Sequence, residues 1–191
     1  SASPSSNYPN FFGGASLRGW KKVLEAVHTT DCKIAPQLWH VGMARPFKGE
    51  DLPNPELPPI GPSGIDVNTL EQTAEPMSIA KIEEVINAFA RAAADAKRLG
   101  FDGVELHGAH GYLIDQFFWK ETNRRTDEYG DPMALVLEIL EGIRAVVDRN
   151  FVIGLRLGAF EPTLADGIAH AKALEQAGIQ FLDVSYGFTA E

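Results

Sequence analysis

The chain has 191 residues, of which 45% are hydrophobic and 23% are charged, so it contains enough apolar material for one folded core. Its formal net charge of -9 at pH 7, without any Lys/Arg-rich run, argues against partners such as nucleic acids and anionic membranes. The single cysteine cannot form an internal disulfide, and no run reaches the roughly 18 apolar residues that a membrane span needs. The start at Ser1 also lacks a basic segment followed by an apolar one, as an export signal would have. We therefore expect a cytoplasmic protein without disulfides or membrane spans.

The N-terminal half contains one predicted helix, one predicted strand and a long loop. Apolar residues recur at helical spacing over residues 16–28, and Ser16 can cap the start of this helix. A strand is expected over residues 33–39, although Pro36 cannot donate a ladder hydrogen bond there. Residues 41–77 hold more than half of the twelve prolines and show no sustained period. They predict a long loop with a short hairpin, and loops of this length in compact domains usually have a function.

The C-terminal half alternates predicted helices with short, apolar strands. Because each helix returns the chain to the same end of the sheet, the strands should pair in parallel, and the predicted fold class is α/β. Ser78 and Gly100 are typical residues for the start and the end of the first of these helices. The expected elements are helices over residues 78–100, 133–148 and 164–177, and strands over residues 103–106, 151–156 and 181–185.

Two architectures fit this alternation, a doubly wound sheet and a (β/α)8 barrel. Polar residues follow or end successive strands at 37–40, 107–112 and Arg156, as the active-site face of a barrel requires. The Gly-rich turn of a dinucleotide-binding sheet is absent. We therefore expect residues 1–191 to form a single, partial domain of the parallel (β/α)8 type, with four strands. Its two open edges would invite a second copy or another chain to complete the barrel.

The run His107-Gly-Ala-His110-Gly-Tyr112 is the strongest candidate for chemistry. It places two imidazoles and a phenol within six residues, and its glycines let the backbone turn and approach a ligand closely. The histidines could be hydrogen-bond donors to a substrate oxygen, metal ligands, or core residues paired with the backbone. Glu105 could join a metal site, but no further ligand stands at a familiar spacing, so we predict no metal.

The same run belongs to a longer pattern. His107-Gly-Ala-His110-Gly-Tyr112-Leu-Ile-Asp-Gln-Phe117, followed by Thr122-Asn-Arg-Arg-Thr-Asp-Glu-Tyr129-Gly, resembles the signature of the Old Yellow Enzyme family of NAD(P)H:flavin oxidoreductases. Two further segments, Gln37-Leu-Trp39-His40-x-Gly42 and Gly154-Leu-Arg156-Leu, are similar to other motifs of this family. The resemblance implies a TIM barrel that binds FMN, takes its electrons from NADH or NADPH, and reduces activated C=C bonds. It covers the central part of the barrel, strands 3 to 6.

Roles for the cluster follow from the resemblance residue by residue. His107 and His110 would hold the carbonyl or nitro oxygen of an electron-poor alkene, where N–H donors stabilise developing negative charge. Tyr112 would be the proton donor, since a phenol with a pKa of about 10 remains protonated at neutral pH. The hydride would come from the flavin.

Three other residues receive implied roles near the cofactor. Gln37 would pair with the pyrimidine edge of the flavin, and its other interpretation is an ordinary polar residue at a strand end. Arg156 would place a permanent positive charge beside flavin N1 and the C2 oxygen, and its other interpretation is a structural salt bridge. Trp39 would flank the substrate, although an aromatic residue in a strand more often belongs to the core.

Departures from the family pattern leave a second function open. Two strands that normally precede this region, and two that normally follow it and hold the FMN phosphate, are not visible in the chain. Asp131-Pro-Met also stands where the family usually has a second glycine and an arginine, and Met43 stands where it often has arginine. The alternative is therefore a non-catalytic half-barrel, an assembly module or scaffold that has lost flavin binding. A metal-dependent hydrolase is a third hypothesis, which rests only on the two histidines.

Overall fold

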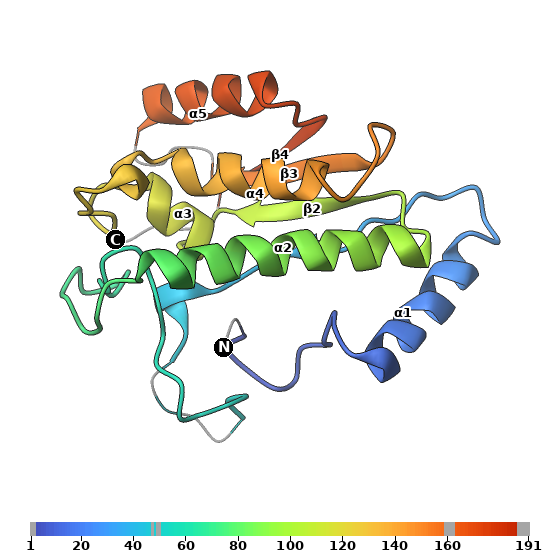
Figure 1. Ribbon diagram of the computed structural model, residues 1–191, viewed down its shortest axis with the longest axis horizontal. Coiled ribbons are helices and arrows are strands. Elements are labelled where there is room, and N and C mark those ends of the chain that lie inside the picture. Colours follow the sequence, from blue (N-terminus) through green and yellow to red (C-terminus); the bar gives the residue numbers. More distant parts are fainter. Residues whose placement is uncertain (1–2, 47, 49–50, 159–162, 187–191) are drawn as a thin grey trace.

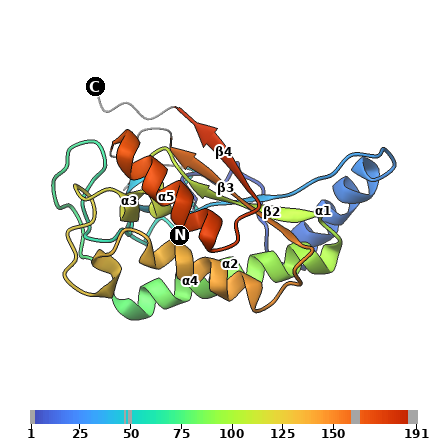
Figure 2. The ribbon, with the colours of Figure 1, turned by 90° about the horizontal axis from the view of Figure 1, so that it is seen from above.

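The structure is a computed structural model that describes residues 3–46, 48, 51–158 and 163–186. Four parallel strands form one sheet, and helices cover one of its faces (Figures 1 and 2). In chain order the elements are α1 (Gly14–Val27), β1 (Gln37–Leu38), η1 (Gly42–Ala44), α2 (Ile79–Leu99), β2 (Gly103–Gly108), α3 (Leu113–Phe118), η2 (Glu128–Gly130), α4 (Ala134–Arg144), β3 (Val152–Gly158), α5 (Leu164–Gln176) and β4 (Phe181–Ser185).

The sheet has the order β1-β2-β3-β4, and every neighbouring pair is parallel. This order confirms the predicted parallel α/β class, because each strand lies next to the one before it in the chain. The register aligns His107 of β2 with Arg156 of β3 and Asp183 of β4. Since side chains alternate between the two faces of a strand, residues in register share a face of the sheet.

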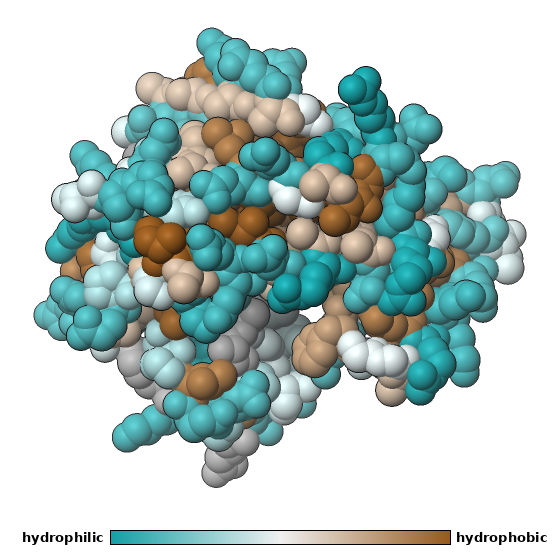
Figure 3. Space-filling model, in the orientation of Figure 1, coloured by the Kyte–Doolittle hydropathy of each residue, from teal (hydrophilic) through white to brown (hydrophobic). Residues whose placement is uncertain are grey.

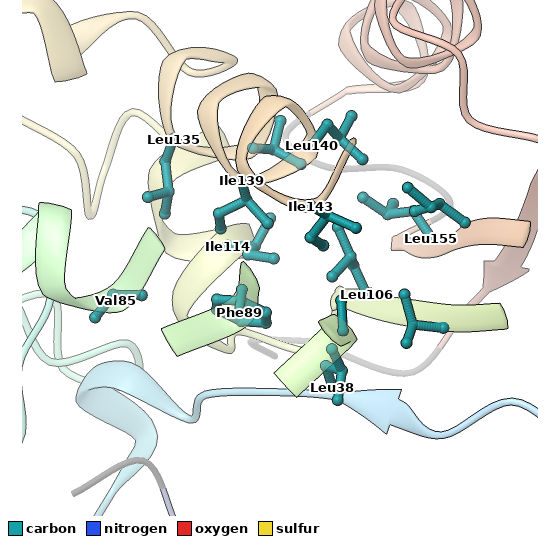
Figure 4. Packing of buried hydrophobic residues seen from close by; sticks show 14 of the residues in the cluster. Leu38, Val85, Phe89, Leu106, Ile114, Leu135, Ile139, Leu140, Ile143 and Leu155 are labelled. Atoms are coloured by element: carbon teal, nitrogen blue, oxygen red, sulfur yellow. The ribbon is translucent and has the colours of Figure 1, made fainter. Parts of the chain in front are cut away.

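The face under the helices holds the hydrophobic core. Leu38, Leu106 and Leu155 lie in register on three strands and are at most 5% exposed. Figure 4 shows them in one layer of packed side chains with Phe89 of α2 and Ile139 of α4, which belong to the same buried cluster. Burial of each such side chain contributes on the order of 2 kcal/mol, so this layer fixes the sheet against its helices.

The helix α2 begins and ends where the sequence predicts. The Ser78 side chain accepts a hydrogen bond from the backbone N–H of Lys81, and Gly100 ends the helix in the left-handed conformation with φ of 103°. Figure 1 shows α2 lying beside α4 across the sheet. On this side of the molecule, apolar patches are interrupted by hydrophilic residues (Figure 3). Among the described helices, none is long and apolar enough to cross a membrane.

Several predicted boundaries are wrong, for local reasons. The first helix begins at Gly14 with Gly13 as its N-cap, so Ser16 is not the cap. The first strand contains only two residues, because Pro36 has no N–H for the ladder, although its carbonyl still accepts from the N–H of Glu105. The expected hairpin in the long loop is a single antiparallel bridge between Ile65 and Gln72.

Candidate active site

The residues predicted for the site meet on the sheet face opposite the helices, near the carboxyl ends of the strands. Gln37 comes from β1, His107 from β2 and Arg156 from β3. No described helix covers this face, as Figure 2 shows. The parallel register therefore brings together three side chains that lie far apart in the sequence, as the barrel interpretation predicts.

His107 is the most enclosed of these side chains, with 6% of its surface exposed. Its Nδ1 lies 3.1 Å from Gln37 Oε1, while its Nε2 is buried without a hydrogen-bond partner among the described residues. Burial, followed by the nearby positive charges of His110 and Arg156, lowers the pKa of His107 from 6.5 to about 4. The ring is therefore neutral at pH 7, with one nitrogen that carries a proton and one that accepts.

His110 lies on a turn that few residues can form. It has φ of 60° and Gly111 has φ of 70°, so two consecutive residues are left-handed. This turn places the His110 ring 5.1 Å from that of His107, measured between centroids, and Nε2 of His110 lies 2.8 Å from Ser185 Oγ. A strained non-glycine residue of this kind is common at functional sites.

Tyr112 follows the turn and faces the same cluster. Its ring centroid lies 4.8 Å from that of His107 and 5.6 Å from that of Trp39, on which it stacks. Burial, followed by the proximity of Tyr8, raises the pKa of Tyr112 above its ordinary value of 10.0. The phenol therefore stays protonated at neutral pH, as a proton donor requires.

Arg156 forms the salt bridge that one of its two interpretations expects, and its role toward a flavin stays a prediction. Its Nη1 lies 3.5 Å from Asp183 Oδ2, and its Nη2 donates to Ser185 Oγ over 3.0 Å, while Nε is buried without a partner among the described residues. The side chains of Arg156 and Asp183 are 33% and 43% exposed, so water screens the ion pair and its contribution to stability is small. The guanidinium remains a fixed positive charge beside Ser185 and His110.

Four residues near the site did not receive a site role from the sequence. Ser185 bridges His110 and Arg156, Asp183 pairs with Arg156, and Glu105 accepts a hydrogen bond from the amide of Gln37. Tyr8 of the N-terminal segment packs edge-on against Trp39 at 5.1 Å between centroids.

A signal for two of them was present in the sequence. Asp183 and Ser185 alternate along the predicted strand 181–185, so both face the same side. For Tyr8 no local pattern predicted the contact.

Among the residues that the structure describes, no three histidine, cysteine or carboxylate side chains gather as metal ligands.

Comparisons with known proteins identify relatives over nearly the whole chain. Residues 2–187 match the family model of the NADH:flavin oxidoreductase / NADH oxidase family. The chain is 40% identical over 181 residues to an NADH oxidase of Thermoanaerobacter brockii, covering 90% of this chain and 27% of the relative. It is 33% identical to 12-oxophytodienoate reductase 2 of Arabidopsis thaliana, covering 87% of this chain and 47% of the relative.

Solved structures agree with this. Morphinone reductase in complex with tetrahydroNAD superposes with a TM-score of 0.77 at 28% identity, covering 95% of this chain and 57% of that protein. A 2-naphthoyl-CoA reductase gives a TM-score of 0.83 at 27% identity, covering 100% of this chain and 32% of that protein. The chain thus spans about a quarter to a half of these curated relatives, and its sheet is part of an α/β barrel.

FMN and NAD(P)H are the cofactors that the family and its NADH and NADPH oxidoreductases imply. The side chains present fit a flavin ring. An amide such as that of Gln37 pairs with adjacent donor and acceptor atoms, as on a pyrimidine edge. The positive charge of Arg156 suits the anionic reduced flavin, and its buried Nε is a donor without a partner among the described residues.

Proposed function

Because the chain belongs to the NADH:flavin oxidoreductase / NADH oxidase family, we propose that it is an FMN-dependent oxidoreductase that uses NAD(P)H to reduce the activated C=C bond of α,β-unsaturated carbonyl compounds. One observation carries this proposal. The ring centroid of His107 lies 5.1 Å from that of His110 and 4.8 Å from that of Tyr112. These rings gather on the face of the sheet that also bears Gln37 and Arg156. Two imidazoles and a protonated phenol can then act on one small substrate.

The two histidines activate the substrate through its oxygen. Nε2 of His107 is buried without a partner among the described residues. It donates to this oxygen when the ring proton is on Nε2, which requires the Gln37 amide to turn so that its N–H group, and not Oε1, faces Nδ1. We expect His110 to contact the same oxygen, with its ring oriented by Ser185. N–H donors at this position stabilise the negative charge that develops on the oxygen as the alkene is reduced.

The alkene gains a hydride at one carbon and a proton at the other. The hydride would come from FMN when it is bound, with NAD(P)H as the reductant. Tyr112 donates the proton from its hydroxyl group, and the phenolate that remains recovers a proton from water. Its raised pKa keeps the hydroxyl protonated between turnovers, at the cost of a weaker acid.

Gln37 and Arg156 hold the flavin in this proposal. The Gln37 amide is placed by Glu105 and by Nδ1 of His107, so the residue that meets the cofactor also touches the residue that meets the substrate. Trp39 stacks on Tyr112 and limits where the alkene can lie. Side chains held in this way would orient the substrate and the flavin relative to the proton donor, and positioning is a large part of catalysis.

Substitution Tyr112→Phe tests the proposal. We expect flavin reduction by NAD(P)H to be retained, and the reduction of 2-cyclohexen-1-one to slow by about 100-fold or more, as for loss of a general acid. Rapid mixing that follows flavin absorbance measures the two half-reactions separately. A Phe variant that reduces the enone at the rate of the unsubstituted protein would contradict the role of Tyr112.

The alternative is a non-catalytic half-barrel, and one observation favours it. In the described sheet, β1 and β4 each have a neighbour on one side only, and Val184 on β4 is 63% exposed. A second copy or another chain would then complete the barrel. A titration with FMN at micromolar concentration separates the two functions, because the half-barrel interpretation expects no change in the visible spectrum.

A further inference from the structure

Gln116 is a polar residue in the most buried helix of the chain. All six residues of α3 are buried, and Gln116 is only 1% exposed. A primary amide in such a place costs free energy unless each of its hydrogen-bonding atoms is paired. The partners that it finds therefore indicate why it is there.

Its amide joins the two loops that form the candidate active site. Nε2 donates to the carbonyl of Val41 over 3.1 Å and to the carbonyl of Gly111 over 2.6 Å, and Oε1 accepts from the N–H of Met43 over 3.1 Å. The first and third partners follow β1, and the second is in the turn after β2. One side chain thus links the carboxyl ends of two strands.

Neighbouring backbone also packs closely against the Gln116 amide. Gly42 has φ of 61°, and a Cβ atom at this position would clash with the Gln116 amide. A Cβ at Gly61 would lie 3.0 Å from Oε1, so the long loop after β1 also closes on this side chain. Glycine at both positions therefore leaves room for the Gln116 amide.

The turn itself is held from the same helix. Asp115 Oδ2 accepts from the N–H of Gly111 over 2.7 Å, and the N–H of Leu113 donates to the carbonyl of His40 over 2.8 Å. His110 and Gly111 are both left-handed, a conformation that the surrounding contacts must maintain. Contacts from α3 therefore reach both the turn and the loop that faces it.

We propose that Gln116 is a positioning residue, which fixes the His110–Tyr112 turn against the loop after β1 and so sets where the His110 ring and the Tyr112 hydroxyl lie relative to Trp39. The proposal rests on the proposed function, because it concerns the placing of the groups that would meet the substrate. It differs from a purely structural role, in which the amide would only satisfy buried carbonyls.

Substitution Gln116→Glu tests the proposal while preserving the shape of the side chain. The new side chain can still accept from Met43, but a carboxylate donates to neither Val41 nor Gly111, and a carboxyl group that burial keeps protonated donates to only one of them. At least one of the two links is therefore lost, and the turn should move. Asn123→Asp is the matched control. Asn123 is 8% exposed and donates to two carbonyls, of Phe117 and Tyr129, which lie outside the turn.

The functional measurement is kcat/KM for 2-cyclohexen-1-one, expressed per bound flavin. Because a displacement of about 1 Å can lower rates by about 100-fold, we expect a loss of about 10- to 100-fold in Gln116→Glu and less than twofold in Asn123→Asp. A structural role would lower the amount of folded, flavin-loaded protein equally in both variants and leave kcat/KM per flavin unchanged. That second result would overturn the proposal.

Amide hydrogen exchange gives a readout that needs neither flavin nor turnover. In Gln116→Glu the Met43 N–H keeps an oxygen acceptor, so the informative amide is that of Gly111, which donates to Asp115 within the turn. If the turn moves, the Gly111 amide should lose protection by more than tenfold in Gln116→Glu and keep it in Asn123→Asp. If Gln116→Glu does not fold, the unsubstituted protein decides the matter. There the two amides should open together, with similar protection, because one side chain ties both loops.

The exchange measurement also separates the failure of the two proposals. A chain that reduces no enone contradicts the proposed function, while coupled exchange of Gly111 and Met43 would still support the link through Gln116. Protection of these two amides that differs by more than tenfold in the unsubstituted protein, or Gly111 protection that survives Gln116→Glu, would overturn the link even in an active enzyme.

Discussion

Substitution of His107 by glutamine is expected to make the folded protein less sensitive to acid. Folding lowers the pKa of His107 from 6.5 to about 4, mainly by burial and then by the charges of His110 and Arg156. Between these two pH values the unfolded chain binds more protons than the folded chain. Stability that is present at neutral pH is therefore lost as the pH falls from 6.5 towards 4.

The size of the effect follows from the two pKa values. A shift of the His107 pKa from 6.5 to about 4 means that folding favours the neutral ring over the charged ring by about 3 kcal/mol. Of this free energy of unfolding, about 2 kcal/mol should be lost when the pH falls from 7 to 4.5. The substitution His107→Gln removes this loss of stability. Losses that come from other groups remain, including the loss caused by His40, whose pKa is lowered to about 3. The unsubstituted protein should thus lose about 2 kcal/mol more than the variant over this range.

Urea unfolding at both pH values, followed by circular dichroism, measures this difference. The fixed cost of losing the His107 ring cancels, because only the change with pH is compared between the two proteins. Equal losses of stability in the two proteins would show that His107 is not held neutral by its surroundings. The argument that a neutral imidazole donates to the substrate would then lose its basis.

Two further changes test the site and the scaffold. Arg156→Met should raise the dissociation constant of FMN by about 10- to 100-fold, because a hydrogen bond from a charged group is lost. Arg156→Lys keeps the charge, so its dissociation constant should rise less. A fluorescence titration with FMN measures both constants. Ser78→Ala should lower the free energy of unfolding by about 1 kcal/mol through loss of the α2 cap, and unchanged urea midpoints would contradict the cap.

The sequence predicted those parts of the fold that depend on local signals. Ser78 and Gly100 define α2 because a cap and a left-handed glycine act within one turn of the helix. The strand over residues 181–185 was also predicted with its observed bounds. The Old Yellow Enzyme resemblance, the parallel (β/α)8 class and the FMN cofactor agree with the family match and with the solved structures.

Elements that depend on distant contacts were predicted less well. The helix α3 was missed because all its residues are buried, so it has no polar face and no helical period that a sequence pattern could reveal. The fourth helix ends at Arg144, four residues before the predicted boundary at 148. Apolar periodicity continues through Val146 and Val147 after the helical hydrogen bonds have ended, because residue 147 still packs on the core.

In the candidate site, too, the sequence predicted what depends on local signals and missed what depends on distant contacts. The sequence predicted Gln37, His107 and Arg156, because polar residues at the ends of apolar strands stand out from their neighbours. It could not predict that Asp183 lies opposite Arg156, since register between strands depends on how the sheet packs rather than on either strand alone. The structure places all the predicted residues on one face, while their roles remain the proposals made above.

The run from His107 to Tyr112 therefore depends on two kinds of order. Parallel register aligns His107 with Arg156 and sets what lies beside the histidine. The left-handed pair at His110 and Gly111 then reverses the chain, so that Tyr112 comes back to within 4.8 Å of the His107 ring. The first kind of order is supplied by the sheet and its core. The second has no regular secondary structure to maintain it, and Asp115 and Gln116 are the side chains whose hydrogen bonds reach that turn from α3.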